Sequence, residues 1–464
     1  MEALTPEAWR LAAIVAAVVV LWFTEALPLA VTALLGAAAC VLLGVAPAKE
    51  VFAPFADPLI FLFIGSFLLA EAIRLHGIDR RLAYAVLAVP WVGERPRRIL
   101  AAVALVSAAI SGFISNTVTA AMMVAIVAGI LTAIEEAAAR TGRRPAPVFA
   151  TGLMLCVAFA ASIGGLATPI GTPTNLIGLR FIATELGVTI SFLGWCGIGL
   201  PLVAVLGAVL VAVLGRLFPA GVDRLDGVAA FVAAERRRLG PWTPGQRSTA
   251  VAFAATVAMW IVPGILLAVL GPDHEICRWL KDRLPESVAA IVGAGLLFIL
   301  PGDDGRRALA WRDARIDWDV VLLYGGGIAL GELCFSKGLA QAAGGAITGW
   351  IPPGAWAGAV LVVAAASAAV LTSEFTSNVA SATMVVPVVI ALGRAIGADP
   401  LVAALAATFA SSMGFMMPVS SPCNAIVYGT GRIPLRAMMA AGAILDVVGL
   451  AVISGVMLLA ARMR

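Results

Sequence analysis

Long apolar runs, separated by short polar segments, fill almost the whole sequence. A helix needs about 20 such residues to cross the hydrocarbon core of a bilayer. The runs lie at residues 9–25, 28–46, 59–75, 98–113, 118–134, 148–168, 193–217, 248–270, 286–301, 319–335, 355–371, 379–396, 401–417 and 437–461. They do not alternate as the ~10-residue strands of a membrane β-barrel do. The sequence therefore predicts an all-α, multi-pass protein of the inner (plasma) membrane, with room for roughly ten spans.

Composition narrows the possible functions. Hydrophobic residues make up 61% of the chain and charged residues 12%, whereas about a quarter of a soluble domain is charged. The chain has no basic face of the kind that binds nucleic acid. Its six scattered cysteines and two distant histidines indicate neither a disulfide framework nor a metal cluster. An intramembrane enzyme would need a catalytic histidine, an acid pair or such a cluster, so we expect neither an enzyme nor an organic cofactor.

Polar residues interrupt one of these apolar runs. The stretch ISGFISNTVTAAMM (110–123) places Ser115, Asn116 and Thr117 where a span could have continued. Arginines precede and follow the surrounding segment, and arginine-rich loops face the cytoplasm. Segment 98–134 should therefore enter and leave the membrane from the same side, as a re-entrant hairpin with the tripeptide at its tip.

A second stretch, LTSEFTSNVASATMVV (371–386), repeats the pattern around Ser377 and Asn378. The segments on either side of 355–396 carry almost no positive charge. The positive-inside rule thus predicts a second hairpin over 355–396 that enters from outside.

Other motifs also occur twice. Residues 62–78 resemble residues 323–339, so that Gly65 pairs with Gly326. TPIGTPTNLIG (168–178) resembles MPVSSPCNAIVYG (417–429) in its two prolines and its asparagine. Three correspondences in one order predict two related halves, 1–215 and 248–464, joined by a cytoplasmic linker, 216–247. The arginine pattern gives the halves opposite orientations, and inverted repeats are typical of secondary transporters.

The proline motifs predict two broken helices, 148–182 and 401–430. Pro169, Gly171 and Pro173 are incompatible with a continuous helix, because proline lacks a backbone donor and clashes with the preceding turn. Opened backbone is tolerated in a membrane where it lines a cavity or is buried in protein. Half-helix N-termini favour an anion there, and carbonyl, Ser, Thr and Asn oxygens suit a small hard cation.

Fixed positive charge is missing from these motifs. No Lys, Arg or His occurs in 111–119, 168–176 or 417–425, and the only charge in 372–381 is Glu374. Moving a dianion to the middle of the membrane would then be costly, so we infer that cations bind with it. Glu374 is equally compatible with a local structural role and with a role beside a cation. Arg180 is predicted to be a helix-end residue that reaches toward the interface.

Three further groups receive structural predictions. Glycines 325–327 and Gly65 are predicted to allow close helix packing rather than to contact a ligand. Glu71 and Glu332 are flanked by apolar residues, which makes them candidates for function. Asp303 and Asp304 lie in a polar loop and are predicted to be solvated.

Seven motifs in one order give the chain a family resemblance. They are TEALPLAVTALL (24–35), IFLFIGSFLLA (60–70), SNT (115–117), GTPTN (171–175), LLYGGGIAL (322–330), SEFTSNV (373–379) and SSPCN (420–424). The chain resembles the divalent anion/sodium symporter family, the INDY-type dicarboxylate carriers, over nearly its whole length. The resemblance implies an elevator-type transporter that binds two or more sodium ions and is usually a homodimer.

The resemblance also implies site residues. A first sodium ion would lie among Ser111, Ser115, Asn116 and Gly171, and a second among Ser373, Thr376, Asn378 and Ser420. The substrate-binding positions would be Asn116, Thr117, Thr172, Ser377, Asn378, Val379 and Ser421.

The chain departs from the family pattern at three places. Val379 stands where many members have a threonine, and Ser420, Ser421 and Cys423 replace the commoner Ala, Thr and Pro. These changes bear on which anion is preferred. In addition, residues 5–20 resemble the second membrane helix of fuller members, so we expect one N-terminal helix to be missing and the N-terminus to lie outside.

The leading functional hypothesis is sodium-coupled uptake of a C4-dicarboxylate such as succinate, malate or fumarate. Symport of sulfate or a tricarboxylate, and sodium-independent dicarboxylate exchange, remain as alternatives. An exchanger would more naturally carry a fixed cationic group. A channel fits less well, because inverted repeats with two hairpins suit alternating access.

Overall fold

The computed structural model describes residues 4–142, 145–342 and 356–462. Within them every named element is a helix, and ten helical segments are long and apolar enough to cross a membrane. The prediction of an all-α, multi-pass membrane protein is therefore confirmed. Arg143 and Arg144, which flank the first predicted hairpin, and residue 355, where the second begins, lie outside the described residues.

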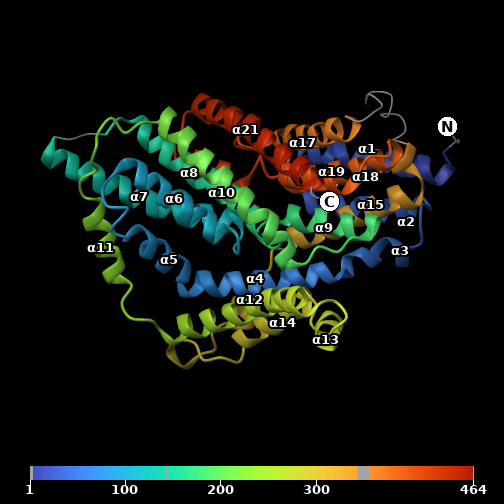
Figure 1. Cartoon of the computed structure of the whole chain (residues 1–464), viewed down its shortest axis with the longest axis horizontal. Helices are drawn as coiled ribbons and strands as arrows, with labels where there is room; N and C mark the ends of the chain where they lie inside the picture. Colours follow the sequence, from blue (N-terminus) through green and yellow to red (C-terminus); the bar gives the residue numbers. More distant parts are fainter. Residues whose placement is uncertain (1–3, 143–144, 343–355, 463–464) are drawn as a thin grey trace.

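Ten of the helices pack together as one group, which we call the hairpin bundle (Figure 1). Its members in the first half of the chain are α6 (Pro96–Ser111), α7 (Asn116–Thr141), α8 (Val148–Gly164), α9 (Pro173–Leu186) and α10 (Phe192–Leu217). Its members in the second half are α17 (Ala357–Phe375), α18 (Asn378–Ala395), α19 (Pro400–Ala410), α20 (Pro422–Tyr428) and α21 (Leu435–Arg462). The two halves interlock, because α9 packs on α18 and α19 while α20 packs on α7 and α8.

A second group, which we call the flanking bundle, lies beside the first. It contains α1 (Pro6–Thr24), α2 (Leu29–Leu42), α4 (Pro58–His76), α12 (Pro244–Leu270), α14 (Glu286–Leu297) and α15 (Trp318–Ser336). Figure 1 shows α12 and α14 running along α4, and the contacts also join α15 to α2 and α4. The two bundles meet where α9 and α18 contact α15 and where α10 contacts α12.

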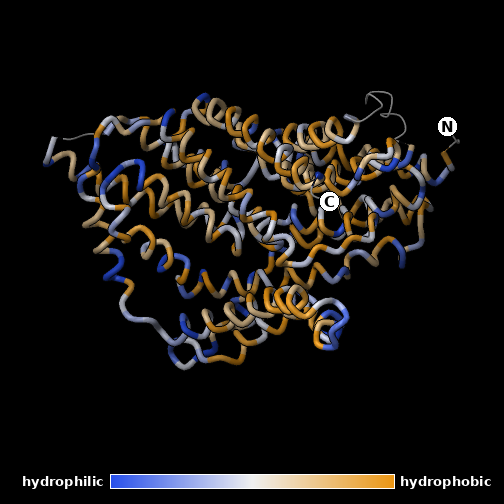
Figure 2. The backbone as a smooth tube through the Cα atoms, viewed as in Figure 1, coloured by the Kyte–Doolittle hydropathy of each residue, from blue (hydrophilic) through white to orange (hydrophobic). Residues whose placement is uncertain are grey.

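Short helices connect the long ones. They are α3 (Ala48–Phe52), α5 (Ile78–Leu87), α11 (Val228–Arg238) and α13 (Glu275–Arg283). Hydrophilic residues gather at the end of α11, around α13 and at the chain turns, whereas the long helices are mostly hydrophobic (Figure 2). In α12, 11% of the most apolar window is buried inside the protein although its mean hydropathy is 2.3. An apolar surface this exposed is stable when it faces lipid.

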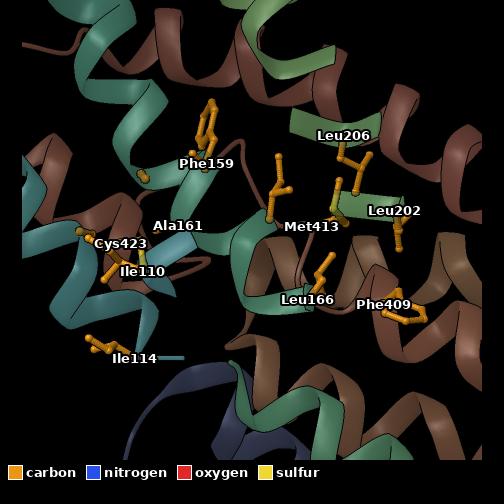
Figure 3. Close-up of a cluster of buried hydrophobic side chains, with 14 of the residues drawn as sticks. Ile110, Ile114, Phe159, Ala161, Leu166, Leu202, Leu206, Phe409, Met413 and Cys423 are labelled. Carbon is orange, nitrogen blue, oxygen red and sulfur yellow. The ribbon is translucent and has the colours of Figure 1, made fainter. Parts of the chain in front are cut away.

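Close packing of small residues builds the core of the hairpin bundle. A Cβ atom on Gly164 of α8 would lie 2.3 Å from the Ala108 backbone of α6, so glycine is needed for this approach. Larger side chains fill the remaining space, and Figure 3 shows residues of α6, α8, α10 and α19 meeting there. The ring centroids of Phe159 and Phe415 are 4.8 Å apart. This rigid core lies directly behind the two helix breaks.

The flanking bundle uses glycine in the same way. A Cβ atom on Gly65 of α4 would lie 2.6 Å from the backbone of Ala290 in α14. A Cβ atom on Gly326 of α15 would lie 2.7 Å from the Cβ atom of Ala33 in α2. Glycines 325 and 327 also approach other side chains too closely to carry one of their own. The prediction of close packing at these glycines is therefore confirmed.

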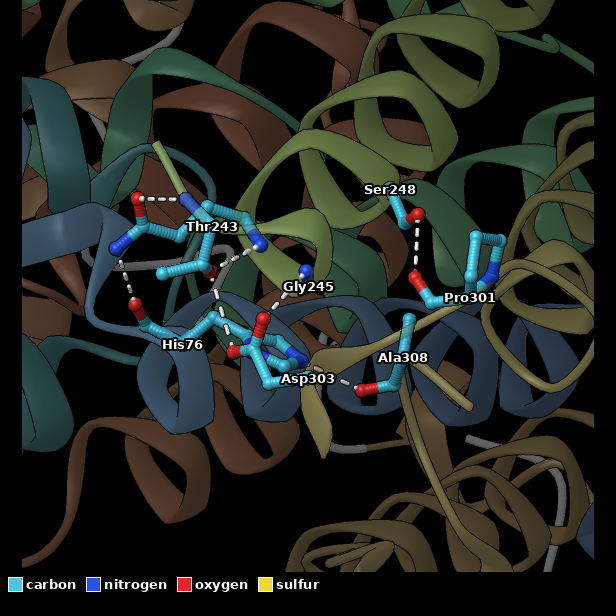
Figure 4. Close-up of polar contacts among 8 residues, drawn as sticks. His76, Thr243, Gly245, Ser248, Pro301, Asp303 and Ala308 are labelled. Carbon is cyan, nitrogen blue, oxygen red and sulfur yellow. Dashed lines mark hydrogen bonds and ion pairs between the residues drawn. The ribbon is translucent and has the colours of Figure 1, made fainter. Parts of the chain in front are cut away.

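A polar junction joins the end of α4 to the start of α12 (Figure 4). The Asp303 carboxylate accepts hydrogen bonds from the Gly245 backbone N–H and the Thr243 hydroxyl, and it lies 3.3 Å from Nδ1 of His76. The bond from Gly245 is the main cause that lowers the pKa of Asp303, with the Thr243 bond and the nearby His76 acting in the same direction. The prediction that these loop acids are solvated holds for Asp304, which is exposed, and is incomplete for Asp303, whose side chain is 38% exposed but also satisfies backbone donors at the start of α12.

Candidate functional site

The first hairpin tip lies between α6 and α7. Helix α6 ends at Ser111, and α7 begins at Asn116 with Ser115 as its N-cap. One atom of the Asn116 side-chain amide lies 2.6 Å from the Ser111 hydroxyl oxygen, 3.2 Å from the Gly171 carbonyl oxygen and 3.3 Å from the Ala161 carbonyl oxygen. Three oxygens thus converge on this amide, from the hairpin and from the first helix break.

The second hairpin tip has a related arrangement, in which the serine rather than the asparagine contacts a carbonyl of the helix break. Helix α17 ends at Phe375, and α18 begins at Asn378 with Ser377 as its N-cap. The Ser373 hydroxyl donates to Oδ1 of Asn378 at 2.7 Å and lies 2.8 Å from the carbonyl oxygen of Ser411, in the second break. The pair Ser373 and Asn378 therefore corresponds to Ser111 and Asn116.

The first helix break separates α8 from α9. After a short 3₁₀ turn the backbone is extended at Thr168, and α9 starts at Pro173, where the missing N–H of proline is tolerated. The amide nitrogen of Asn175 donates to the carbonyl oxygens of Gly165 and Thr168, both at 2.8 Å. These two bonds satisfy backbone acceptors that the break deprives of helical partners.

The second helix break separates α19 from α20 and is held in the same way. The amide nitrogen of Asn424 donates to the carbonyl oxygens of Gly414 at 3.1 Å and Met417 at 2.9 Å. Both Asn175 and Asn424 are fully buried, and the side-chain oxygen of each has no hydrogen-bond partner among the described residues. Each half of the chain thus opens one helix and closes the opening with one asparagine.

Glu374 stabilises the second helix break through hydrogen bonds. Its carboxylate accepts hydrogen bonds from the backbone N–H groups of Met416 and Met417 and from the Ser420 hydroxyl. The side chain is buried and is absent from the lining of the cavity described next. These contacts are compatible with both roles left open by the sequence, because they hold the break and also place the carboxylate against Ser420, a predicted sodium position.

A cavity of about 450 Å³ lies where both tips and both breaks meet. All seven predicted substrate positions line it: Asn116, Thr117, Thr172, Ser377, Asn378, Val379 and Ser421. Four predicted sodium positions also line it, namely Ser115, Asn116, Gly171 and Asn378. The other four, Ser111, Ser373, Thr376 and Ser420, are fully buried and do not line it. The hydroxyl of Thr376 donates to the Thr372 carbonyl of its own helix at 2.8 Å.

The cavity has no fixed positive charge among its described lining residues. Its charged residues are Asp317 and Asp319, which are exposed at the start of α15. Helices α7, α9 and α18 begin at the cavity, and helix N-termini carry partial positive charge. The remaining polar groups are hydroxyls, amides and carbonyls, which bind both anions and small hard cations.

The oxygen-rich surroundings of Asn116 and Asn378 fit a small cation. Hydroxyl, amide and carbonyl oxygens are the ligands that hard cations prefer. At the first tip, Ser111, Gly171 and Ala161 supply oxygens around the Asn116 amide. The oxygens present are therefore chemically suited to hold sodium.

Sequence reasoning missed several residues of this region. The carbonyls of Ala161 and Ser411 leave no mark on the sequence, because every residue has a carbonyl. The aromatic residues of the lining, Phe63, Phe67 and Phe113, read as ordinary membrane-helix residues. Asp317 and Asp319 come from the end of a loop, and their place in the cavity depends on tertiary packing.

The prediction for Arg180 was wrong. Rather than reaching toward the interface, its guanidinium pairs with Asp57, with Nε 3.0 Å from Oδ2, and with Glu332, with Nη2 2.8 Å from Oε1. A charge within a membrane segment is stabilised by an opposite charge more than by a partial exit to water. The sequence held a usable signal, because Glu332 is an acid inside a predicted span and therefore needs a partner.

Known proteins are similar to this chain over most of its length. The family described as the sodium:sulfate symporter transmembrane region matches residues 1–462. The sodium-dependent dicarboxylate transporter SdcS of Staphylococcus aureus (strain USA300) is 30% identical over 434 residues, which cover 91% of this chain and 80% of that protein.

Two solved structures are similar in fold. The YdaH transporter of Alcanivorax borkumensis has a TM-score of 0.55 at 14% identity and covers 90% of this chain and 86% of its own. MtrF of Neisseria gonorrhoeae, described as one of a class of antimetabolite efflux pumps, has a TM-score of 0.57 at 12% identity and covers 91% of this chain and 85% of its own. At these identities the likeness concerns the fold alone.

Proposed function

The chain belongs to the sodium:sulfate symporter family and is a membrane transporter rather than an enzyme, and we propose that it couples sodium entry to uptake of a C4-dicarboxylate such as succinate, malate or fumarate. We place it in the plasma membrane of the cell. The name of the relative SdcS, a sodium-dependent dicarboxylate transporter, supports both the ion and the class of anion.

One observation carries the proposal. Two hairpin tips, each with a Ser–Asn hydrogen bond, face one cavity whose described lining has no Lys, Arg or His. A dianion in such a cavity has only helix N-termini and neutral donors to offset its lost hydration, and this loss is large in a membrane. Bound cations supply the missing positive charge, so anion binding becomes dependent on sodium. This argument favours symport over sodium-independent exchange.

The proposed roles of the site residues follow from their chemistry. The substrate carboxylates accept hydrogen bonds from the side chains of Asn116, Thr117, Thr172, Ser377, Asn378 and Ser421, while Val379 contacts the carbon chain. One sodium ion binds among Ser111, Ser115, Asn116 and Gly171. A second binds among Ser373, Thr376, Asn378 and Ser420. Asn116 and Asn378 belong to both sets, which makes them the point of coupling.

We further propose that the two halves are inverted repeats and that the hairpin bundle moves against the flanking bundle in an elevator-type cycle. The matched close contacts of Gly65 with Ala290 and of Gly326 with Ala33 support the repeat. The matched asparagines at the two breaks support it as well. The working unit in this proposal is a homodimer. In each protomer the flanking bundle stays fixed while the hairpin bundle moves.

Symport of sulfate or of a tricarboxylate is the second candidate. The description of the family names sulfate, and the serines at 420 and 421 leave a different hydroxyl pattern from the commoner Ala-Thr pair. A volume of about 450 Å³ accommodates any of these small anions, so the choice depends on competition experiments.

The test is uptake of labelled succinate into proteoliposomes that hold the purified protein. An inward sodium gradient is compared with an equal potassium gradient, and malate, citrate and sulfate compete in excess. Uptake that requires sodium and is blocked by malate supports the proposal. Uptake equal in both salts that requires internal dicarboxylate would establish exchange and remove both sodium sites. Sodium-dependent uptake of sulfate or citrate with no uptake of succinate would establish the second candidate.

A further inference from the structure

Four acids occupy matching places on two helices of the flanking bundle. Asp57 caps the start of α4, where Oδ1 accepts the Leu59 N–H at 2.9 Å, and Asp317 caps the start of α15, where Oδ1 accepts the Val320 N–H at 3.3 Å. Further along, Glu71 of α4 and Glu332 of α15 stand at equivalent positions in the sequences LAEAIRLHG and LGELCFSKG. Each helix therefore carries one acid at its start and one in its second half.

The acids Asp57 and Glu332 form one pair, and Arg180 binds both of them. The distances are 3.0 Å from Nε to Asp57 and 2.8 Å from Nη2 to Glu332. The Asp57 side chain is 3% exposed, so this ion pair is largely desolvated. Arg180 belongs to α9 of the hairpin bundle, whereas both acids belong to the flanking bundle. The arginine thus ties the two bundles together.

Asp317 and Glu71 are the other two acids, and no arginine of the hairpin bundle binds either of them among the described residues. Asp317 is exposed at the 450 Å³ cavity. Glu71 pairs locally with Arg74 of its own helix, and Nε of Arg315 lies 3.8 Å away. At one end of the α4–α15 pair, an ion pair therefore joins the flanking bundle to the hairpin bundle. At the other end, no such ion pair is present among the described residues.

The cavities show the same asymmetry. The large cavity contains Asp317 together with the residues of both hairpin tips. A separate cavity of about 200 Å³ contains Asp57 and Arg180 and no residue of either tip. Such a difference is expected of a transporter whose site is reached from the side of Asp317 and not from the side that Arg180 bridges.

We infer that Arg180 is a gating residue, which holds the transporter in this conformation by binding Asp57 and Glu332, and that Arg432 replaces it in the opposite conformation by binding Asp317 and Glu71. This inference rests on the alternating access of the proposed function. Arg432 is the first arginine beyond Asn424, as Arg180 is the first beyond Asn175, although Arg180 lies within α9 and Arg432 in the loop after α20. In this structure its Nη1 lies 3.3 Å from Oε1 of Glu135, a side chain that is 65% exposed.

The energetics favour such an exchange. Removing one partner from a buried ion pair leaves an unpaired charge, and this destabilises the conformation that contains it. The pair of Arg432 with the exposed Glu135 contributes little, because water screens it. Each arginine would therefore stabilise one end state and leave the other almost unaffected, so the two substitutions should act in opposite directions.

The experiment measures the populations of the two conformations by pulsed electron spin resonance. Spin labels are attached to cysteines that replace Leu105 on α6 and Trp279 on α13, both exposed, in the full-length protein with its six native cysteines changed to alanine. We expect Arg180→Met to lower the ratio of this conformation to the opposite one at least tenfold, and Arg432→Met to raise it. Arg180→Lys should give a smaller decrease, because an ammonium group cannot bridge both acids as a guanidinium does.

Two control variants remove ion pairs that do not join the bundles. Arg238→Met removes the pair of Arg238 with Glu235, in which both residues belong to α11. Glu135→Gln removes the present partner of Arg432. Neither control should change the ratio more than about twofold. Glu332→Gln serves as the second gate variant if Arg180→Met does not fold, and it should lower the ratio in the same direction.

The inference is overturned if Arg180→Met and Glu332→Gln change the ratio of the two conformations no more than the controls do. It is also overturned if Arg180→Met and Arg432→Met shift this ratio in the same direction. Failure of the proposed function gives a different result. In that case the unsubstituted protein shows no sodium-dependent uptake, whatever the spin labels report about the populations.

Discussion

The asparagines at the two helix breaks give the most direct test of how the site is held. In Asn424→Ala, the carbonyls of Gly414 and Met417 lose the only side-chain donor that the structure gives them. Each lost bond costs about 0.5–1.5 kcal/mol, and the Gly414 carbonyl, left buried without a partner, raises its share to about 1–3 kcal/mol. The Met417 carbonyl keeps the Ser420 N–H at 3.3 Å. The unpartnered side-chain oxygen is removed as well, which offsets part of the loss. We expect a net destabilisation of about 2–4 kcal/mol.

Asn175→Ala should cost the same amount, because Asn175 makes the equivalent two bonds at 2.8 Å. The assay is thermal unfolding in detergent, followed by the amount of monodisperse protein that survives heating. A change of about 2–4 °C per kcal/mol is typical of larger domains, so each variant should melt on the order of 5–15 °C lower. Sodium-dependent uptake should fall with it, since the breaks carry Gly171 and Ser420.

Cys423→Ala is the matched control, because Cys423 is equally buried and next to Asn424. It removes packing atoms without a hydrogen bond to the break, so its melting temperature should change by no more than about a third as much. The reasoning is refuted if both asparagine variants have the same melting temperature as Cys423→Ala. A large loss at one asparagine and none at the other would refute the equivalence of the two breaks.

Three further outcomes are expected. Asn116→Ala and Asn378→Ala should each abolish sodium-dependent uptake and leave the elution profile in detergent unchanged; wild-type uptake in both would contradict the site. Gly65→Ala should lower stability by about 1–3 kcal/mol, measured as a melting shift, because its Cβ atom would lie 2.6 Å from backbone. The pKa of Asp303 is lowered below its ordinary 3.8, so its contribution is present above that pH and is lost as the pH falls further. The melting temperature of Asp303→Asn should therefore change less between pH 5 and pH 3 than that of the unsubstituted protein.

The parts of the fold that follow from hydropathy and from helix-breaking residues could be predicted. Apolar runs of about 20 residues identify membrane helices because the bilayer core has a fixed thickness. Proline and glycine mark the breaks at Pro169 and Pro173, since a helix cannot pass through both. The Ser–Asn pairs drew attention because polar residues are costly in a membrane unless they have a role.

The remaining features depend on which distant groups meet. The carbonyls of Ala161 and Ser411 contribute to the two tips through the backbone, which the sequence does not distinguish. Arg180 meets Asp57 from 123 residues away and Glu332 from 152, and neither separation follows a helical or repeat period. Asp303 was read as a solvated loop residue because its donors, on Thr243 and Gly245, belong to another segment.

The missing fixed cation has a consequence for coupling under the proposed function. A lysine or arginine in the cavity would attract a dicarboxylate with or without sodium, and the protein could then carry the anion uncoupled. With neutral walls, and with Asp317 and Asp319 at the exposed end of the cavity, the anion meets a repulsive and poorly compensated site until cations occupy it. Sodium and anion must then favour each other's binding by the same factor, because coupling between two ligands is reciprocal. A lysine at Val379 should therefore raise sodium-independent binding of succinate, measured by calorimetry, while it lowers the dependence of uptake on sodium.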